Sequence, residues 1–501
     1  MAQVAVLAQT FCYSEHLFVF SQRPSKNVVS DAMGATDKAV GRTMPTLLQE
    51  LQEQANHAEA AEKSSLGGIV RCSDKQCQQQ VQVKASKPRI DCIDGSRFAL
   101  VLPIIIGHFI KFGTDKTLLL KLLTQENVFV GGFFLISGYV SAYVTTKVGE
   151  RECEKKKLAK PELFFWQKVM SYYPLHFLIS TLFSPMFVAV DVWMKNSFKT
   201  TVFHGILNYT LAQAWFPSEA EIWNPPTWFL SALTFANFTM PTILLPQVAG
   251  LSKDALRKLI YGLGALSLLQ KVSYSQAWQY QCRGGFMCRT NTPHLWNVTR
   301  FHPFWALIEV TMGIAAARDV MLDGSAQQGS RPSNPLLYFL ASYASVALRI
   351  TKFNLNDAMI RSTLFVPLYL KFLQTMHRDC LSDSPRLITR FFGSRFMARM
   401  GALAFPMFIL HGPIGQLFYK KAVATRLWGR VMPKKFFPAY LLIVMLSGHV
   451  VNEVFVKSKR VQRLSARLAQ ILADRTHGML QDQVSGIESS KPAGSNAEQV
   501  H

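Results

Sequence analysis

Charged residues are scarce in this chain. Asp, Glu, Lys and Arg together make up 17% of its 501 residues, whereas hydrophobic residues make up 49%. The charges collect between long apolar runs, several of which approach the roughly 17–25 residues that a membrane-spanning helix needs. This pattern excludes a set of ordinary soluble domains. It predicts an all-α fold, a polytopic transmembrane bundle of about ten helices, in which Thr201–Ala214 is either an eleventh helix or an interfacial one.

Acidic residues are fewer than basic ones. The chain has 31 Asp and Glu against 54 Lys and Arg, which gives a formal net charge of +23. Such a balance is typical of nucleic-acid binding proteins, but here the basic residues fall in loops and tails between apolar segments. Membrane orientation and anionic lipid place them there. We therefore expect a lipid bilayer as a partner, and no nucleic acid.

Motifs of metal sites and of soluble hydrolases are missing. The eight cysteines include two close pairs, Cys72/Cys77 and Cys282/Cys288, but no CxxC set, so we predict no metal site. If the loop with Cys282 and Cys288 faces an oxidising lumen, the two can form a short disulfide. The sequence has neither the GxSxG elbow of serine hydrolases nor a phosphate-binding glycine loop.

The N-terminal region lacks the basic n-region and the clear cleavage site of a secretory signal. Few acidic residues precede Glu50, so an organellar transit peptide stays open, although we expect an endomembrane or the plasma membrane. Residues 1–95 are predicted to form a polar, mostly disordered leader with one short helix near Thr46–Lys63.

The remaining chain divides into a transmembrane domain over residues 96–457 and a C-terminal region over residues 458–501. The C-terminal region combines a basic amphipathic helix over Ser458–Leu472, which can lie on the membrane surface, with a disordered tail after about Thr476. Ten segments are predicted to span the membrane: Phe98–Gly113, Val128–Thr146, Tyr172–Trp193, Trp228–Val248, Leu256–Val272, Phe301–Ala317, Pro335–Ile350, Met359–Met376, Arg399–Tyr419 and Phe436–Val456.

Basic loops favour a cytosolic location of both termini. The segments that this arrangement places inside are Lys147–Lys168, Lys253–Lys258, His377–Arg399 and the tail after Val456. One segment disagrees, because Lys420–Lys435 carries six basic residues and falls outside. The outer side would also hold two glycosylation acceptor patterns, at Asn208 and Asn297.

Ionisable residues inside the predicted spans are few, and two histidines lead the set. At about 1.5 Å of helix rise per residue, Arg97 and His108 lie on the order of 16 Å apart, so Arg97 at the membrane edge places His108 near the midplane. His411 lies at a similar depth in the ninth span. Two such histidines can serve as a general base and its orienting or acid partner. Two unrelated interhelical hydrogen bonds are the alternative.

Two carboxylates also fall in or near spans. Glu309 lies in the sixth span and Glu453 near the end of the tenth, and Arg97 is a reasonable ion-pair partner for either.

Small and aromatic residues supply two further candidates. Ser137 lies in VGGFFLISGY, where the glycines favour close helix packing, and it can bond a neighbouring helix or a substrate. Trp228 ends a Trp- and Pro-rich loop that is typical of the membrane interface and can also form a substrate platform.

These stretches, in this order, resemble the acyltransferase 3 family of integral-membrane acyltransferases. Arg97 and His108 match its arginine–ten residues–histidine signature. Later matches run from VGGFFLISGY through FFWQKVMSYYPLHF, WNPPTWFLSAL, HPFWALIEVTMG and FPMFILHGPI to NEVF, and cover roughly Arg97–Lys459.

The chain departs from the family pattern in three places. Lys168 and Ser171 stand where two arginines are common, and Phe229 and Leu233 replace a serine and a glutamate. The closing proline is absent near Phe455 and Val456.

The resemblance implies an O-acyltransferase that moves an acyl group, often acetyl, from a cytosolic acyl-CoA co-substrate to a hydroxyl of a glycan, lipid or small molecule, with no tightly bound cofactor. His108 suits the general base, and an acyl-histidine intermediate is the variant route. His411 is its expected partner, Arg97 and Lys168 suit the phosphates of the donor, and Ser137, Trp228, Glu309 and Glu453 are further candidates for binding.

Two other classes of function remain open. A transporter or channel would use His108, His411 and Glu309 as a polar path across the membrane. A catalytically silent scaffold would keep the fold alone. Inverted repeats would favour the transporter, and no convincing internal repeat is present.

Overall fold

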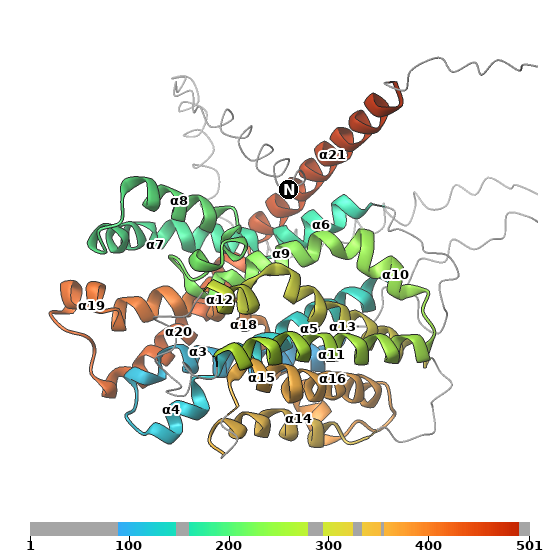
Figure 1. Ribbon diagram of the computed structural model, residues 1–501, viewed down its shortest axis with the longest axis horizontal. Helices are drawn as coiled ribbons and strands as arrows, with labels where there is room; N and C mark the ends of the chain where they lie inside the picture. The colour runs from blue at the N-terminus through green and yellow to red at the C-terminus, as the bar shows by residue number, and fades with distance from the viewer. Residues whose placement is uncertain (1–88, 147–159, 279–293, 324–332, 352–354, 490–501) are drawn as a thin grey trace, which may run out of the picture. The chain divides into compact units, whose positions relative to one another are not determined.

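The computed structural model of the protein describes residues 89–146, 160–278, 294–323, 333–351 and 355–489 (Figure 1). Within these ranges every regular element is a helix, which confirms the all-α class. The predictions for the leader up to residue 88, including its short helix and the Cys72/Cys77 pair, lie outside the described residues. The Cys282/Cys288 pair and the tail after residue 489 lie outside them too.

Helices occupy every predicted span. They are α3 (Asp91–Phe109) with η2 (Ile110–Phe112), α5 (Glu126–Thr145), α7 (Tyr173–Trp193), α9 (Trp228–Thr239) with η6 (Met240–Leu244) and α10 (Leu245–Ala249), α11 (Lys253–Trp278), α13 (Pro303–Met321), α14 (Pro335–Ala344) with η9 (Ser345–Arg349), α15 (Asp357–Ile360) with η10 (Arg361–Phe365) and α16 (Val366–Cys380), α18 (Arg395–Tyr419), and α20 (Phe437–Val451) with η12 (Asn452–Val456).

Six helical stretches in the described chain are long and apolar enough to cross a membrane. They coincide with the first four and the last two predicted spans, so a count of ten is not confirmed. The six are Asp91–Phe112, Thr117–Thr145, Pro161–Trp193, Pro225–Ala249, Arg395–Tyr419 and Lys434–Val456.

Shorter helices connect or flank these stretches. They are α4 (Thr117–Leu123), α6 (Pro161–Met170), α8 (Phe198–Tyr209), η3 (Gln213–Trp215), η4 (Pro217–Glu219), η5 (Pro225–Thr227), α12 (His294–Phe301), α17 (Leu387–Phe392), α19 (Lys421–Trp428), η11 (Lys434–Phe436) and α21 (Lys459–Ser489). The region Thr201–Ala214 thus forms most of α8, with η3 after it. The predicted amphipathic helix is α21, which continues past Leu472 to Ser489 instead of giving way to a tail near Thr476.

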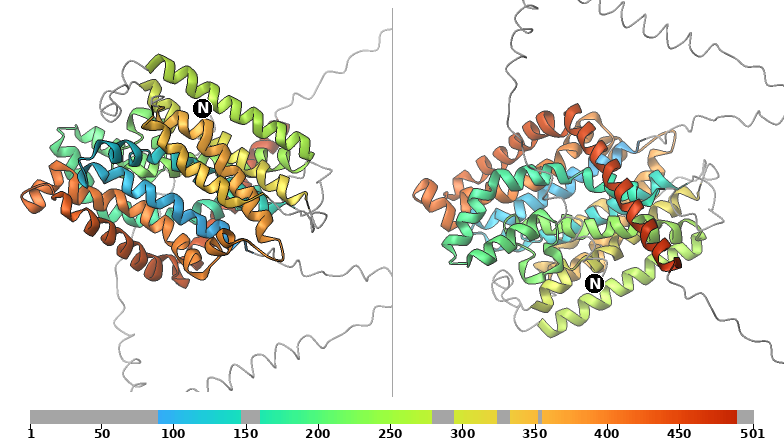
Figure 2. Two further views of the ribbon diagram at one scale, coloured as in Figure 1. Left: turned by 90° about the horizontal axis from the view of Figure 1, so that it is seen from below. Right: turned by 90° about the horizontal axis from the view of Figure 1, so that it is seen from above.

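Three long helices pack side by side at the centre, α3, α5 and α13, and α18 lies against α3 (Figure 2). Two glycines bring α5 and α13 into backbone contact. A Cβ at Gly138 would lie 2.0 Å from the carbonyl oxygen of Val310, and one at Gly313 would lie 2.1 Å from that of Leu135. The helices therefore cannot accept a side chain at either position, as the small-residue rule for membrane helices predicts.

Three wide π turns interrupt the α geometry of the described helices, and two of them, η6 and η10, contain or lie near a proline. In η6 the residue Pro241 lacks an N–H donor, and Pro367 lies two residues after the end of η10. A proline leaves a carbonyl of the preceding turn without its usual partner, and widened turns are one way to absorb this. The turn in η10 presents Arg361 to the interior, where it is buried.

The glycosylation pattern at Asn208 is wrong as a prediction of an accessible site. Asn208 is fully buried. Its backbone carbonyl lies 2.9 Å from Nε2 of His176, and its side-chain oxygen accepts a hydrogen bond from Ser180. An asparagine bonded in this way holds α7 and α8 together. The same contact gives His176, which is fully buried, a structural role in the interior.

Candidate active site

The two histidines predicted at similar depth are in direct contact. His108 on α3 and His411 on α18 have ring centroids 4.9 Å apart and ring planes inclined by 64°. Their helices pack along their lengths, which is why residues far apart in the sequence meet here. His108 is half-buried and His411 is fully buried.

Each histidine is oriented by a carbonyl of its own helix. The Nδ1 of His108 lies 2.8 Å from the carbonyl oxygen of Ile104, and the Nδ1 of His411 lies 2.6 Å from that of Phe408. A carbonyl can only accept a hydrogen bond, so this geometry assigns the proton to Nδ1 in both rings. The lone pair then resides on Nε2. The Nε2 of His411 has no hydrogen-bond partner among the described residues.

A buried carboxylate lies beside His108, and sequence reasoning missed it. Glu126 is 4% exposed. A Cβ added at Gly107 would lie 3.2 Å from Oε2 of Glu126, so this carboxylate packs against the backbone next to His108. Glu126 stands at the first turn of α5, directly before an apolar run, and that position was the signal available in the sequence.

The loop before α9 supports His411 from the other side. Asn224 is fully buried and donates a hydrogen bond of 3.0 Å to the carbonyl of Ile409. Gln416 donates one of 2.7 Å to the carbonyl of Trp223. A Cβ at Gly412 would lie only 2.4 Å from Oδ1 of Asn224. This Oδ1 has no partner within the described chain, so a polar atom without a hydrogen bond lies directly beside the residue after His411.

Arg97 and Lys168 come together near the start of α3. Arg97 pairs with Asp94 at 3.1 Å and is about one-third exposed. The guanidinium of Arg97 lies close enough to the ammonium group of Lys168 for the two positive charges to interact. Lys168 is half-buried, and its Nζ lies 5.5 Å from the ring centre of Phe164. Two cations held close together, one of them open to solvent, can bind a phosphate group.

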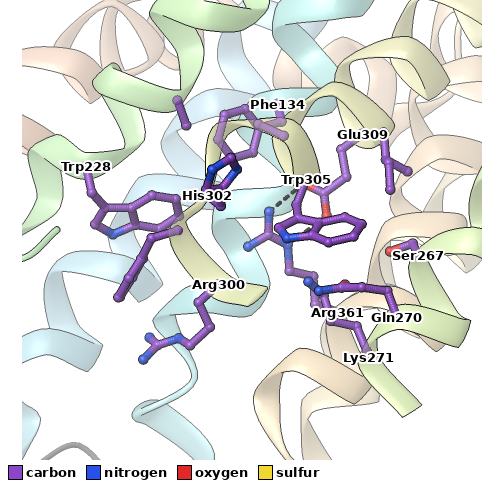
Figure 3. A pocket seen from close by; sticks show the side chains of 14 residues that line it. Phe134, Trp228, Ser267, Gln270, Lys271, Arg300, His302, Trp305, Glu309 and Arg361 are labelled. Atoms are coloured by element: carbon purple, nitrogen blue, oxygen red, sulfur yellow. Dashed lines mark hydrogen bonds and ion pairs between the residues drawn. The ribbon is translucent and has the colours of Figure 1, made fainter. Parts of the chain in front are cut away.

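Glu309 and Trp228 belong to a different pocket, shown in Figure 3. Glu309 is 3% exposed and is paired with Arg361 through two hydrogen bonds, of 2.7 and 2.5 Å. Arg361 also donates 2.8 Å to the side-chain oxygen of Asn127. The prediction that Arg97 is the partner of Glu309 is therefore wrong. Lys271 donates to the carbonyl of Thr299 at the same pocket.

This pocket has room for about 10 Å³, roughly one water molecule. Trp228 is buried against Phe301, with ring centres 4.9 Å apart. A chain of aromatic contacts links the pocket to the histidines. The ring centres of Phe134 and Phe229 are 4.6 Å apart, and those of Phe229 and Phe408 are 5.6 Å apart. The ring centre of Phe408 lies 5.7 Å from that of His411.

The last two predicted site residues differ in exposure. Glu453 is exposed and pairs with Lys457 at 2.6 Å, so Arg97 is not its partner either. Ser137 is half-buried on α5, next to the tightly packed Gly138. Among the described residues, no group of three or more His, Cys, Asp or Glu is arranged to hold a metal ion.

Comparison with known proteins identifies the class of the chain. A family model described as an acyltransferase domain matches residues 90–450, which include both histidines and the centre of the bundle. The chain belongs to the acyltransferase 3 family. Neither the curated proteins nor the solved structures contain a significant match.

Membership of this family supports an acyltransferase-type activity. Together with the long apolar helices, it indicates a membrane protein.

Proposed function

We propose that the protein is a membrane-bound O-acyltransferase. It would move an acyl group, with acetyl as the first candidate, from a cytosolic acyl-CoA to a hydroxyl of a glycan, lipid or small molecule. The observation that carries the proposal is the contact between His108 and His411 inside the region that matches the acyltransferase family. We further propose an endomembrane or the plasma membrane as its location and no tightly bound cofactor.

His108 is assigned as the general base. With its Nδ1 proton directed at Ile104, its Nε2 can take the proton of the attacking hydroxyl. The hydroxyl oxygen then bonds to the thioester carbonyl carbon, the carbon–sulfur bond breaks, and the CoA thiolate leaves with the proton that His108 returns. An imidazole suits both transfers because it titrates near neutral pH.

His411 and Glu126 are assigned supporting roles. His411 contacts the ring of His108 and has an unused Nε2, so it can hydrogen-bond a reacting group or the attacking hydroxyl. Glu126 packs against the backbone next to His108, and we assign it to positioning of the base.

Arg97 and Lys168 are assigned to the donor. Both lie near the N-terminal end of α3, about 16 Å along the helix from His108, so phosphates held there leave room for an extended arm that reaches the base. The predicted basic segment Lys147–Lys168 lies outside the described residues up to residue 159.

The test is transfer of label from acetyl-CoA. Purified protein in lipid discs is incubated with labelled acetyl-CoA and a cell extract, and glycan, lipid and small-molecule fractions are counted. We expect label in one fraction and a loss of about 10²–10⁴-fold in rate for His108→Ala, the usual contribution of a general base. The matched control is His449→Ala, which removes an exposed histidine on α20.

Two results would contradict the proposal. Undiminished transfer by a correctly folded His108→Ala protein would remove the assigned base. No thioester consumption by the wild type would favour a scaffold, or a transporter if labelled solute instead crosses the membrane of a sealed vesicle.

A further inference from the structure

The last helix, α21, lies outside the region that matches the family, because the match ends at residue 450 and α21 begins at Lys459. No residue of α21 is assigned to the acyl transfer proposed above. Figure 1 shows it rising away from the bundle at an angle, with its first part beside α6.

One face of α21 is fixed against α6. Ala469 and Ala473 are 1% and 4% exposed, and small residues such as these allow a close approach. The indole N–H of Trp166 donates a hydrogen bond of 3.0 Å to the hydroxyl of Thr476. The orientation of the helix about its own axis is therefore set by the protein itself.

The roughly opposite face of α21 carries large apolar side chains that are exposed. Leu464, Leu468 and Ile471 are 58%, 39% and 50% exposed. Their spacing of four and three residues puts them on one stripe of the helix. Exposure of such a stripe to water is unfavourable, at roughly 25 cal/mol per Å² of apolar surface.

Arginines flank this stripe. At 3.6 residues per turn, Arg460, Arg467 and Arg475 all fall within about 60° of Leu464 around the helix axis, and all three are exposed. Lys459, also exposed, falls on the far side. An apolar stripe bordered by cations is the pattern of a helix that lies in the interface of a bilayer.

The chain also places α21 at the membrane boundary. The last stretch that can span a membrane ends at Val456, three residues before α21 starts. Beside the junction lies a pocket of about 340 Å³ between α21, α6 and the start of α7. Its lining is largely apolar and includes Met170, Leu175, Phe455 and Val461, which is a surface suited to contact with lipid chains.

We propose that the face formed by Leu464, Leu468, Ile471 and the flanking arginines docks on a leaflet of anionic phospholipid. The apolar residues enter the boundary of the acyl chains, and the arginines pair with the phosphate and carboxylate groups of the lipid heads. A second copy of the chain is the less favoured occupant, because the arginines of two identical faces would repel each other.

Hydrogen–deuterium exchange on the full-length protein tests the proposal. The protein is placed in discs of phosphatidylcholine alone and in discs that also contain phosphatidylserine, and exchange is followed for peptides over residues 464–473. We expect stronger protection in the anionic discs. Arg467→Gln should lower that protection about fivefold, which corresponds to ~1 kcal/mol per basic residue at an anionic surface.

The matched control is Lys459→Gln, which removes the same charge from the same helix on its far side and should leave the protection unchanged. Leu464→Ser combined with Leu468→Ser should weaken docking in both kinds of disc. Equal protection of the wild type with and without anionic lipid would overturn the proposal. So would an equal effect of Arg467→Gln and Lys459→Gln, or protection that appears only when a disc holds two copies.

Discussion

The histidine pair and the Glu309–Arg361 pair are both buried groups of ionisable side chains, but their hydrogen bonding differs. Both carboxylate oxygens of Glu309 accept from Arg361, whose remaining nitrogen donates to Asn127. At the histidines, the Nε2 of His411 and the nearby Oδ1 of Asn224 lack partners within the described chain. A fully bonded buried pair belongs to the architecture, whereas unused polar atoms are available to a substrate.

The largest effect expected from this comparison is on stability at Glu309. Glu309→Gln leaves the charge of Arg361 buried without its partner, which should cost about 3–5 kcal/mol in unfolding free energy. The activity of each folded molecule should change little. Unfolding in detergent, monitored by circular dichroism, measures the first quantity, and label transfer per folded protein measures the second.

The double variant Glu309→Gln/Arg361→Gln sharpens that test. It removes both charges, so part of the lost stability should return. If Glu309→Gln instead abolishes transfer without loss of stability, the Glu309–Arg361 pair takes part in catalysis and Glu309 belongs to the reacting site.

The second effect is on catalysis at His411. His411→Gln keeps a side chain of similar length but removes the imidazole, and the rate constant for transfer should fall about 10²-fold. The unfolding free energy should fall far less than in Glu309→Gln. A transfer rate equal to that of the wild type would show that the contact between His411 and His108 does not contribute to catalysis.

The third effect concerns the donor. Lys168→Gln removes one of the two cations near the start of α3, so KM for acetyl-CoA should rise about tenfold, or ~1.4 kcal/mol, with kcat nearly unchanged. Lys258→Gln on α11 is the control for loss of an exposed positive charge. A fall in kcat without a change in KM would contradict the assignment of Lys168 to donor binding.

The smallest effect is expected at Glu453. Its carboxylate is exposed and pairs with Lys457 within the same helical turn. Exposed pairs of this kind contribute little to stability. Glu453→Gln should therefore leave both the melting temperature and label transfer unchanged, and a loss of transfer would bring Glu453 back among the site residues.

The sequence was sufficient for the all-α class and for a similar depth of the two histidines, because both follow from hydrophobic run lengths and from positions along a span. The contact between the two rings depends on the packing of α18 against α3, which the sequence did not predict. Ion-pair partners could not be predicted in the same way. Glu309 meets Arg361 rather than Arg97 because α13 packs against α16, the helix that continues η10. The two residues are 52 positions apart in the chain. No local pattern encodes that choice.

The remaining differences between the sequence-based predictions and the structure concern which residues are buried. Asn208 carries a glycosylation triplet, but bonds from α7 place it inside, and a triplet contains no information on accessibility. Glu126 was not among the predicted site residues, because its burial depends on the close approach of α3 at Gly107. The count of spans stayed open because length and apolarity alone do not tell a buried core helix from a spanning one.

The hydrogen bond between Trp166 and Thr476 also sets an order of events during biogenesis. Its two residues are separated by 310 positions, so at about 5–20 residues per second the ribosome needs on the order of 15–60 s to supply the partner of Trp166. Throughout that interval α6 lacks the contact that α21 supplies. A chain truncated after Val456 would lack this hydrogen bond, and α6 would lose the contact that α21 supplies.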